Sequence, residues 1–421
     1  MSNQRGEGRS WRTAPVLSVA GLSLGGGISA FGVTAVAGDV AAAFGDVTAD
    51  DGPLGQIGLP VTTVGVALAL IRLASLGSLG FSVLADRFGR RRLLLTVAVL
   101  GFGLTSLAAL APSFWWYVAL VALARPCLAA VNIVAGVVAA EESRAVDRAG
   151  AVALITAAYG LGSGLVSVGR GLLPGDPSFR VVTAFALVPL LVLVPLLGPR
   201  VREPAIAANR PSEGRAAARP GAVPRAYRGR VALLAFLVGM IAVATGPGFT
   251  YLFVYGERVL GGQPLQVAGL VLAAGPLGLV GLLLGRWGAD RLGRRITGAL
   301  ALAGTGLAVA LAYSGGLTGL IVGYLAAVLL GGAFAPAQGA LAAELVPTSV
   351  RATVAGWLTV TGVVGAVIGL ATFGLVADAT QGFAAAARSL GALVALSALG
   401  FRALPETRGT ELDELEVDAA D

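Results

Sequence analysis

Residues 86–91 read Asp-Arg-Phe-Gly-Arg-Arg, and residues 290–295 read Asp-Arg-Leu-Gly-Arg-Arg. Asp290 follows Asp86 by 204 residues, and each hexapeptide lies between two long apolar runs. A short charged segment of this kind cannot remain in the hydrocarbon of a bilayer, so it must join two helices at the membrane surface. The glycine permits the tight backbone that such a turn needs. The duplicated turn therefore predicts a membrane protein with two similar halves.

Two further charged signatures keep the same register. A glutamate precedes an arginine by seven residues in each half, and the second pair follows the first by 203 residues: Glu141 with Arg148, and Glu344 with Arg351. Arg202-Glu203-Pro204 and Pro405-Glu406-Thr407-Arg408 place Glu203 and Glu406 203 residues apart as well. We interpret this as a parallel duplication, which is one known plan of transporters.

The composition agrees with a membrane protein. Of 421 residues, 56% are hydrophobic and 13% are charged, whereas soluble domains carry about 25% charged residues. We therefore predict an all-α membrane protein with twelve transmembrane helices in two six-helix bundles related by pseudo-two-fold symmetry. The expected spans are 14–38, 56–84, 92–111, 114–139, 149–172, 180–198, 231–255, 265–288, 296–314, 317–343, 352–376 and 384–402.

The arginines predict the topology. They concentrate in alternate loops, so the positive-inside rule favours cytoplasmic N- and C-termini in a multi-pass protein of the cell inner membrane. The run 14–38 is long enough to be an uncleaved first helix. The expected parts are an N-terminal tail (1–13), a first bundle (14–198), a basic linker (199–230), a second bundle (231–402) and an acidic tail (403–421).

Several function classes can be set aside. The chain has no His and one Cys, Cys127, which lies in an apolar run. A histidine relay, a histidine metal site and an intrachain disulfide are thereby excluded. There is no nucleotide loop or convergent catalytic set, so we expect neither an enzyme nor a cofactor. The net charge of +7 is explained by topology rather than by nucleic acid. The expected partners of this monomer are a small-molecule substrate and the lipid bilayer.

The duplicated turn resembles the signature loop G-x-L-a-D-R-x-G-R-R of the major facilitator superfamily, with Ser82 and, in the second copy, Arg286 in place of its first glycine. Glu-Leu-Val-Pro-Thr-Ser-Val-Arg-Ala at 344–352 and Pro-Glu-Thr-Arg-Gly at 405–409 are similar to the sugar-porter and metabolite-symporter branches. The Gln-Gln and Asn pattern of sugar porters and the D-G-Y-D element of aromatic-acid symporters are missing. The branch is therefore left open.

The resemblance implies that charge pairs at these loops lock the cytoplasmic side and break when the cavity opens inward. Asp86 and Asp290 can pair with arginines or cap a neighbouring helix. The alternatives are that the arginines only anchor topology and that the Glu-Arg pairs are simple interfacial ion pairs. The expected gating residues are Asp86, Arg87, Gly89, Arg90, Arg91, Glu141, Arg148, Asp290, Arg291, Gly293, Arg294, Arg295, Glu344 and Arg351.

Two arginines are expected near the membrane midplane. Arg72 precedes Asp86 by 14 residues and Arg125 precedes Glu141 by 16, which places each roughly 20 Å from the inner end of its helix. An arginine there costs about 2.5–3.5 kcal/mol on insertion scales, so it usually faces an aqueous cavity. Arg125 also matches the fourth-helix arginine of the resembled family. We expect both to bind an anionic substrate; the alternative is that backbone carbonyls or an acid satisfy them.

Other polar residues line up with this site. Asn132 follows Arg125 by seven residues, and Tyr159, Ser163 and Ser167 are spaced by four. They can line a cavity, or the serines can bond to their own helix. In the seventh span, Gly246-Pro247-Gly248 can break the helix, and the aromatics at 249–255 can form a gate or an interfacial belt.

These patterns predict a secondary transporter that moves a small organic solute, such as an anionic metabolite, by alternating access. The alternative is a proton-driven efflux pump for a drug or secondary metabolite. Asp39 ends the first span and Asp378 the eleventh. We select Asp39 as the proton-coupling residue, with protons as a further partner. Both acids could instead be surface residues, and the lack of a midplane acid leaves facilitated diffusion open.

Overall fold

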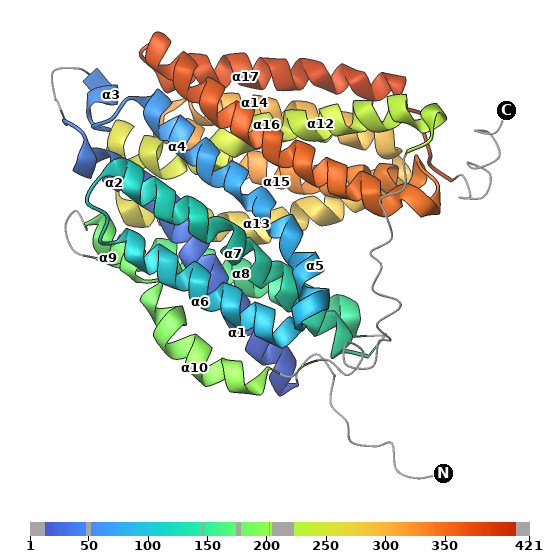
Figure 1. Ribbon diagram of the computed structural model, residues 1–421. Coiled ribbons are helices and arrows are strands. Elements are labelled where there is room, and N and C mark those ends of the chain that lie inside the picture. Colours follow the sequence, from blue (N-terminus) through green and yellow to red (C-terminus); the bar gives the residue numbers. More distant parts are fainter. Residues whose placement is uncertain are drawn as a thin grey trace. The chain divides into compact units, whose positions relative to one another are not determined.

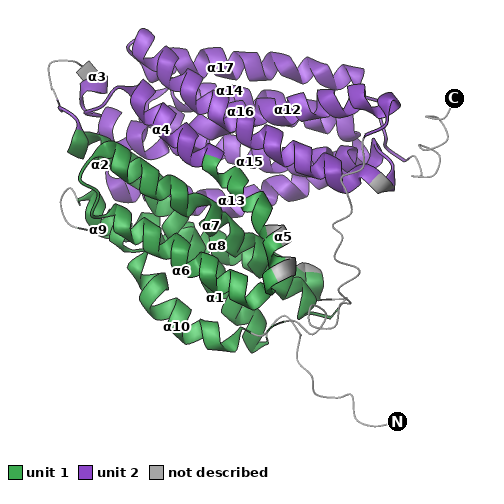
Figure 2. Cartoon of the chain, viewed as in Figure 1, with its two compact units in different colours: residues 1–44, 74–217 green, residues 45–73, 218–421 purple. Residues whose placement is uncertain are grey.

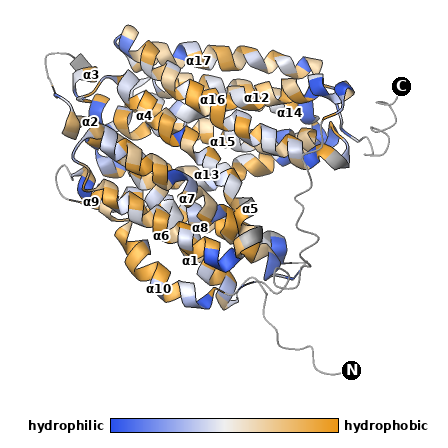
Figure 3. Ribbon diagram, viewed as in Figure 1, coloured by the Kyte–Doolittle hydropathy of each residue, from blue (hydrophilic) through white to orange (hydrophobic). Residues whose placement is uncertain are grey.

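The computed structural model describes residues 13–47, 52–144, 147–173, 178–201, 203 and 223–409. Within these ranges the chain is all helical, without a strand, and twelve helical spans are long and apolar enough to cross a membrane (Figure 1). Hydrophobic residues follow the helices along their lengths, whereas hydrophilic ones gather near the helix ends (Figure 3). The predicted fold class is confirmed.

Among the first six spans, the second and the sixth each consist of more than one helical element. Their elements are α1 (Ala14–Ala35), α4 (Val61–Ala74) with α5 (Ser78–Phe88), α6 (Arg90–Ala108), α7 (Phe114–Glu141), α8 (Arg148–Leu172), and α9 (Phe179–Ala184) with a π turn (Pro189–Leu193) and α10 (Val194–Leu197). The short α2 (Ala37–Phe44) and α3 (Gly52–Gly55) follow α1. Helices α4 and α5 form one span, which a 3₁₀ turn interrupts at Ser75–Gly77.

The last six spans are longer and more regular. They are α12 (Arg225–Thr250), α13 (Pro264–Arg291), α14 (Arg294–Ala312), α15 (Gly316–Glu344), α16 (Arg351–Ala379), and α17 (Phe383–Ser397) with a 3₁₀ turn, η8 (Ala398–Ala403). Most of the predicted linker and the acidic tail beyond Gly409 lie outside the described residues.

The chain forms two compact units (Figure 2). Unit 1 contains residues 1–44 and 74–217, and unit 2 contains residues 45–73 and 218–421. The segment 45–73 belongs to the first half of the sequence repeat, yet it packs with unit 2. The boundary between the units falls at the 3₁₀ turn between α4 and α5. The two predicted bundles, 14–198 and 231–402, correspond to the two halves of the sequence repeat. Their division into domains stays a prediction.

The same pairs of helices pack in each unit. In unit 1, α1 lies against α8, and in unit 2, α12 lies against α16. A Cβ atom on Gly27 would collide with the Tyr159 carbonyl, and one on Gly365 would collide with the Gly239 backbone. Glycines therefore let the two backbones touch, as is common where helices pack inside membranes. Because these are the first and fifth helices of each half, the packing follows the duplication read from the sequence.

The seventh span differs from its prediction. Gly246-Pro247-Gly248 lies inside α12, which continues to Thr250. The helix tolerates Pro247 and ends at Thr250, and a π turn follows at Val254–Val259. Tyr251 and Tyr255 are buried, so an interfacial belt is wrong for them. Instead, an aromatic cluster forms in unit 2 from Tyr251, Tyr255, Tyr313, Phe373 and Phe383.

Candidate functional site

Unit 2 contains a cavity of about 610 Å³ between α12, α15 and α16. Arg72, in the last turn of α4, is the one charged residue in its lining. Three neutral polar residues, Thr245, Gln338 and Thr359, share the cavity with it. The remaining walls are aliphatic side chains and glycine. The cavity thus has the composition of a small-molecule site, in which a few polar groups fix a ligand among apolar walls.

The polar residues of this cavity differ in their remaining hydrogen-bonding capacity. The hydroxyls of Thr245 and Thr359 donate to the carbonyls of Ile241 and Ala355, both at 3.0 Å. Their oxygens can therefore still accept. No hydrogen bond to the Gln338 side chain forms within the described part of the chain. The Gln338 side chain can thus donate N–H groups to a ligand through its amide nitrogen, beside the positive charge of Arg72.

Arg125 lies in unit 1, on α7. Its side chain is half-buried, and Nη1 donates to the Ala30 carbonyl at 3.4 Å. That bond is the one that its guanidinium makes among the described residues. A guanidinium has five N–H donors, so a single long bond leaves most of them without a protein partner there. The sequence-based alternative, satisfaction by backbone carbonyls, accounts for only part of this group.

The other predicted binding residues of unit 1 also lie against α1. The Ser23 hydroxyl lies 2.7 Å from the side-chain amide oxygen (Oδ1) of Asn132 and 3.2 Å from the backbone carbonyl of Ile155, so it can donate to either. The Tyr159 ring packs edge-on against Phe31, with ring centroids 5.8 Å apart. Ser163 is buried and donates to the Gly160 carbonyl at 2.7 Å. Arg125, Asn132 and Tyr159 therefore face α1, whereas Ser163 bonds to its own helix.

Asp39 forms a buried ion pair with Arg170. Nε and Nη2 of Arg170 bond to both carboxylate oxygens of Asp39 at 2.8–3.0 Å, and the two side chains are 2% and 5% exposed. Asp39 lies in the first turn of α2 and Arg170 in the last turn of α8. The surface-acid interpretation of Asp39 is therefore wrong. Arg170 was missed, although it follows Ser167 by three residues and so lies on a neighbouring part of the same helix face.

A charge cluster lies at the duplicated turn of unit 1. Glu203 accepts from the backbone N–H groups of Arg90 and Arg91 at 2.7 and 2.9 Å, at the N-terminus of α6. Arg90 also pairs with Glu141 at 2.9 Å. Arg148 is exposed. The side chains of Asp86 and Arg87 lie outside the described part of the chain.

Unit 2 repeats this arrangement. Glu406 accepts from the N–H groups of Arg294 and Arg295 at 2.9 and 3.1 Å, and Arg294 pairs with Glu344 at 3.1 Å. Asp290 lies 3.8 Å from Nη1 of Arg294 and so forms one of the two contacts expected of it, an arginine pair. The first amides of α14 donate to Glu406. The expected pair of Glu344 with Arg351 does not form among the described residues, because Arg351 donates to the Ala343 carbonyl. Glu344 instead also accepts from Thr407.

The glutamates at 203 and 406 are the missed residues of these clusters. Each carboxylate binds the first two amides of a helix, where free N–H groups and the helix dipole favour an anion. The sequence does hold a signal, since both residues follow the last span of their half in the same register. Arg291, also expected here, stacks its guanidinium over the Trp287 ring at 5.3 Å from the centroid.

Asp378 caps α4, the helix of the first half of the repeat that packs within unit 2. Its two carboxylate oxygens accept from the N–H groups of Val61 and Thr62 at 2.9 and 2.8 Å. The Tyr251 hydroxyl donates to the Val61 carbonyl at 3.2 Å. Because both of its carboxylate oxygens accept these hydrogen bonds, we assign Asp378 to capping α4 rather than to a proton pathway.

The sequence profile described as Major Facilitator Superfamily matches residues 17–288, more than half of the 421 residues. The chain belongs to the Major Facilitator Superfamily. A second profile, Sugar (and other) transporter, matches residues 227–419. No curated protein matches the sequence.

Solved structures of this superfamily have a similar fold. A bacterial homologue of the human lysosomal transporter Spinster, inward-facing and unoccupied, is 14% identical with a TM-score of 0.72, over 98% of this chain and 99% of that chain. The inward-open xylose transporter XylE from E. coli is 19% identical, with a TM-score of 0.67 over 96% and 98%. At these identities the likeness shows the fold alone. Superfamily membership makes the chain a multi-pass membrane transporter and not an enzyme.

Proposed function

We propose that this secondary transporter carries a small organic anion across the inner membrane by alternating access. The observation that supports the substrate class is the lining of the unit 2 cavity, where the one charged residue among the described residues is the cationic Arg72. A guanidinium binds carboxylate and phosphate oxygens with matched geometry. The Gln338 amide adds an uncharged donor beside it. A neutral sugar would not need a cation, and the neutral acceptors that the side chains of the lining offer are the two threonine oxygens and the Gln338 carbonyl.

Arg125 supports the same substrate class from unit 1. Most of its donors are left for a ligand or water, and the half-buried position strengthens any charge interaction there. The proposal assigns Arg72 and Arg125 to substrate binding, with Asn132 and Tyr159 as positioning residues against α1. Ser163 was also selected from the sequence, and its buried hydroxyl gives it a packing role in this proposal.

A ligand-binding screen tests the substrate class. Purified protein would be heated with benzoate, succinate or the neutral sugar xylose, and the unfolding midpoint would be measured. We expect a carboxylate to raise the midpoint and xylose to leave it unchanged, because a ligand stabilises the state that it binds. Arg72→Gln should remove this rise and Arg72→Lys should keep part of it. A rise with xylose alone, or an undiminished carboxylate effect in Arg72→Gln, would reject the proposal.

Proton-driven efflux of a drug or secondary metabolite is the second candidate function. The buried pair of Asp39 and Arg170 favours it, since protonation of Asp39 would break a buried ion pair and change the packing of α2 against α8. In proteoliposomes, Asp39→Asn should abolish accumulation driven by a pH gradient and keep exchange of substrate at equilibrium. If the variant still accumulates substrate, Asp39 is not the coupling residue and facilitated diffusion or another acid is favoured.

The charge clusters at the duplicated turns are proposed as the cytoplasmic gate. This assignment rests on cytoplasmic N- and C-termini, which the arginine distribution favours. In each unit one glutamate accepts hydrogen bonds from the N-terminal amides of a helix. An arginine of the turn forms an ion pair with a second glutamate. Breaking these contacts would free the turn ends of α6 and α14. The transporter is proposed to work as a monomer.

A further inference from the structure

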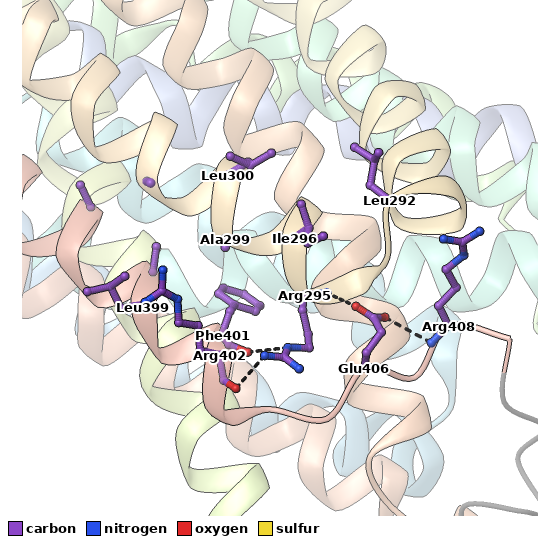
Figure 4. A pocket seen from close by; sticks show the side chains of 13 residues that line it. Leu292, Arg295, Ile296, Ala299, Leu300, Leu399, Phe401, Arg402, Glu406 and Arg408 are labelled. Atoms are coloured by element: carbon purple, nitrogen blue, oxygen red, sulfur yellow. Dashed lines mark hydrogen bonds between the residues drawn. The ribbon is translucent and has the colours of Figure 1, made fainter.

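A groove lies on the outer face of unit 2, between α14 and the end of α17 with η8. Its volume is about 610 Å³. Leu292, Ile296 and Leu300 line it along α14, and Leu399 lies opposite on η8 (Figure 4). Leu300 and Leu399 are 62% and 55% exposed. Such exposure of large apolar side chains fits contact with lipid acyl chains, and the groove gives one chain a defined place.

Small residues create the depth of this groove. Ala299, Ala303, Ala395 and Ala398 lie in its lining and are buried or half-buried. The positions that match them in the first half of the repeat are Leu95, Val99, Val192 and Pro195. In unit 1, Leu95 packs onto Gly198, at the place where the second half has Phe401. The four alanines therefore give the groove of the second half its depth, whereas Phe401, which replaces the smaller Gly198, forms part of its wall.

The end of the groove at the duplicated turn is cationic. Arg295, Arg402, Arg408 and one acid, Glu406, line it. Figure 4 shows Glu406 between the backbones of Arg295 and Arg408, and Arg295 turned toward the Phe401 and Arg402 carbonyls. The Glu406 charge is thus directed at backbone amides of α14 and of Arg408.

Two arginines at this end, Arg402 and Arg408, are exposed in the described part of the chain. The guanidinium groups of Arg402 and Arg408 are exposed and make no hydrogen bond or ion pair among the described residues. The position matching Arg402 in the first half is Pro199. The nearby Arg200 donates to the Leu196 carbonyl instead. The groove of the second half is therefore lined by three arginines and one acid, and the first half has no arginine at the position that matches Arg402.

We propose that this groove binds an anionic phospholipid, with an acyl chain along the four alanines and the headgroup at the cationic end, where Arg402 and Arg408 lie on opposite sides of Glu406 (Figure 4). An apolar slot and a cationic mouth match the two parts of such a lipid, and a zwitterionic lipid would gain less from the mouth. On the proposed topology the mouth faces the cytoplasmic leaflet, where anionic lipids attract basic residues. The inference is independent of what the transporter carries.

Native mass spectrometry of the purified full chain tests this site. The protein would be mixed with equal amounts of phosphatidylglycerol and phosphatidylcholine, and bound lipid counted for each variant. The wild-type chain should retain phosphatidylglycerol preferentially. Arg402→Ala with Arg408→Ala should weaken that binding about 30-fold, since each arginine near a membrane surface contributes about fivefold. Arg200→Ala, at the matching end of unit 1, is the control and should bind as the wild type does.

A second pair of variants tests the apolar slot. Ala299→Leu and Ala303→Val introduce the residues of the first half and should displace the lipid while the thermal unfolding midpoint stays near the wild-type value. Undiminished phosphatidylglycerol binding in both the filled and the double-arginine variants would overturn the proposal. So would equal binding of phosphatidylcholine by the wild type. If lipid bound only after removal of residues 410–421, the acidic tail rather than a lipid would be the occupant of the groove in the full chain, and the proposal would be rejected.

Discussion

Gly89 and Gly293 show how single positions set the charge clusters. Their φ angles are 90° and 104°, in the region that favours glycine. A Cβ atom would also lie 3.2 Å from a Glu203 oxygen and 2.5 Å from a Glu406 oxygen. The sequence predicts the glycine from the tight turn. It does not predict the second reason, because the capping glutamate comes from a segment more than 100 residues away.

Gly293→Ala should therefore destabilise unit 2. The strained backbone costs about 1–3 kcal/mol, and the new methyl group displaces Glu406 from the α14 amides. Thermal unfolding in detergent should show a lower midpoint. Gly331→Ala is the matched control, since a Cβ atom there meets no other atom within 4 Å and alanine favours a helix. If both variants unfold at the same temperature, the cap is not important for stability.

The pair of Asp39 and Arg170 allows a prediction at one contact. Asp39→Asn leaves a buried guanidinium without its counter-charge, which costs about 3–5 kcal/mol. Thermal or denaturant unfolding of purified protein should detect this loss. Adding Arg170→Gln to Asp39→Asn removes the uncompensated charge and should recover part of the stability. An additive further loss in the double variant would mean that the two side chains act independently.

At the scale of elements, the second span shows how a turn divides one apolar run. A 3₁₀ turn separates α4 from α5, and a Cβ atom on Gly77 there would lie 3.1 Å from Pro126. Hydropathy predicts this span as one helix, because the apolar run continues through the turn. It cannot show which unit each part packs with, since the same apolar side chains can face either one. Asp378 and Tyr251 then hold α4 in unit 2.

Removing the cap of α4 should loosen that helix locally. Asp378→Ala leaves the amides of Val61 and Thr62 without an acceptor, and losing a cap costs about 0.5–2 kcal/mol. Hydrogen exchange followed by mass spectrometry should show faster exchange of the peptide that contains these residues. Peptides from α6, in unit 1, should be unchanged and serve as an internal control. Unchanged exchange at 61–62 would show that Asp378 does not hold this helix.

At the scale of the molecule, the duplicated turn and the apolar runs predict the class and the twelve spans. They do so because bilayer thickness fixes helix length and loops must leave the hydrocarbon. The partners of individual charges were harder to predict, as Glu344 with Arg294 and Asp39 with Arg170 show. The cavity residues Thr245, Gln338 and Thr359 were missed because isolated polar residues have no periodic pattern in a long apolar run.

The proposed topology can be tested by chemical labelling. In a chain with Cys127→Ser, a cysteine at Gln381 should react in intact cells with a membrane-impermeant maleimide. A cysteine at Ala403 should react only after the membrane is opened, because it lies at the proposed cytoplasmic end. Both residues are exposed, so burial does not hide either one. The reverse pattern would place the termini outside and reject the cytoplasmic gate.

The most direct test of the substrate class is transport by reconstituted protein. Proteoliposomes would be given the carboxylate that stabilises the protein best, or xylose, and uptake would be followed with the wild type and with the Arg72→Gln and Arg125→Gln variants. We predict saturable carboxylate transport, no xylose transport, and a loss of at least about tenfold in each variant, equivalent to about 1.4 kcal/mol. Xylose transport equal to carboxylate transport, or carboxylate transport unchanged in both variants, would contradict the proposal that these arginines bind an anionic substrate.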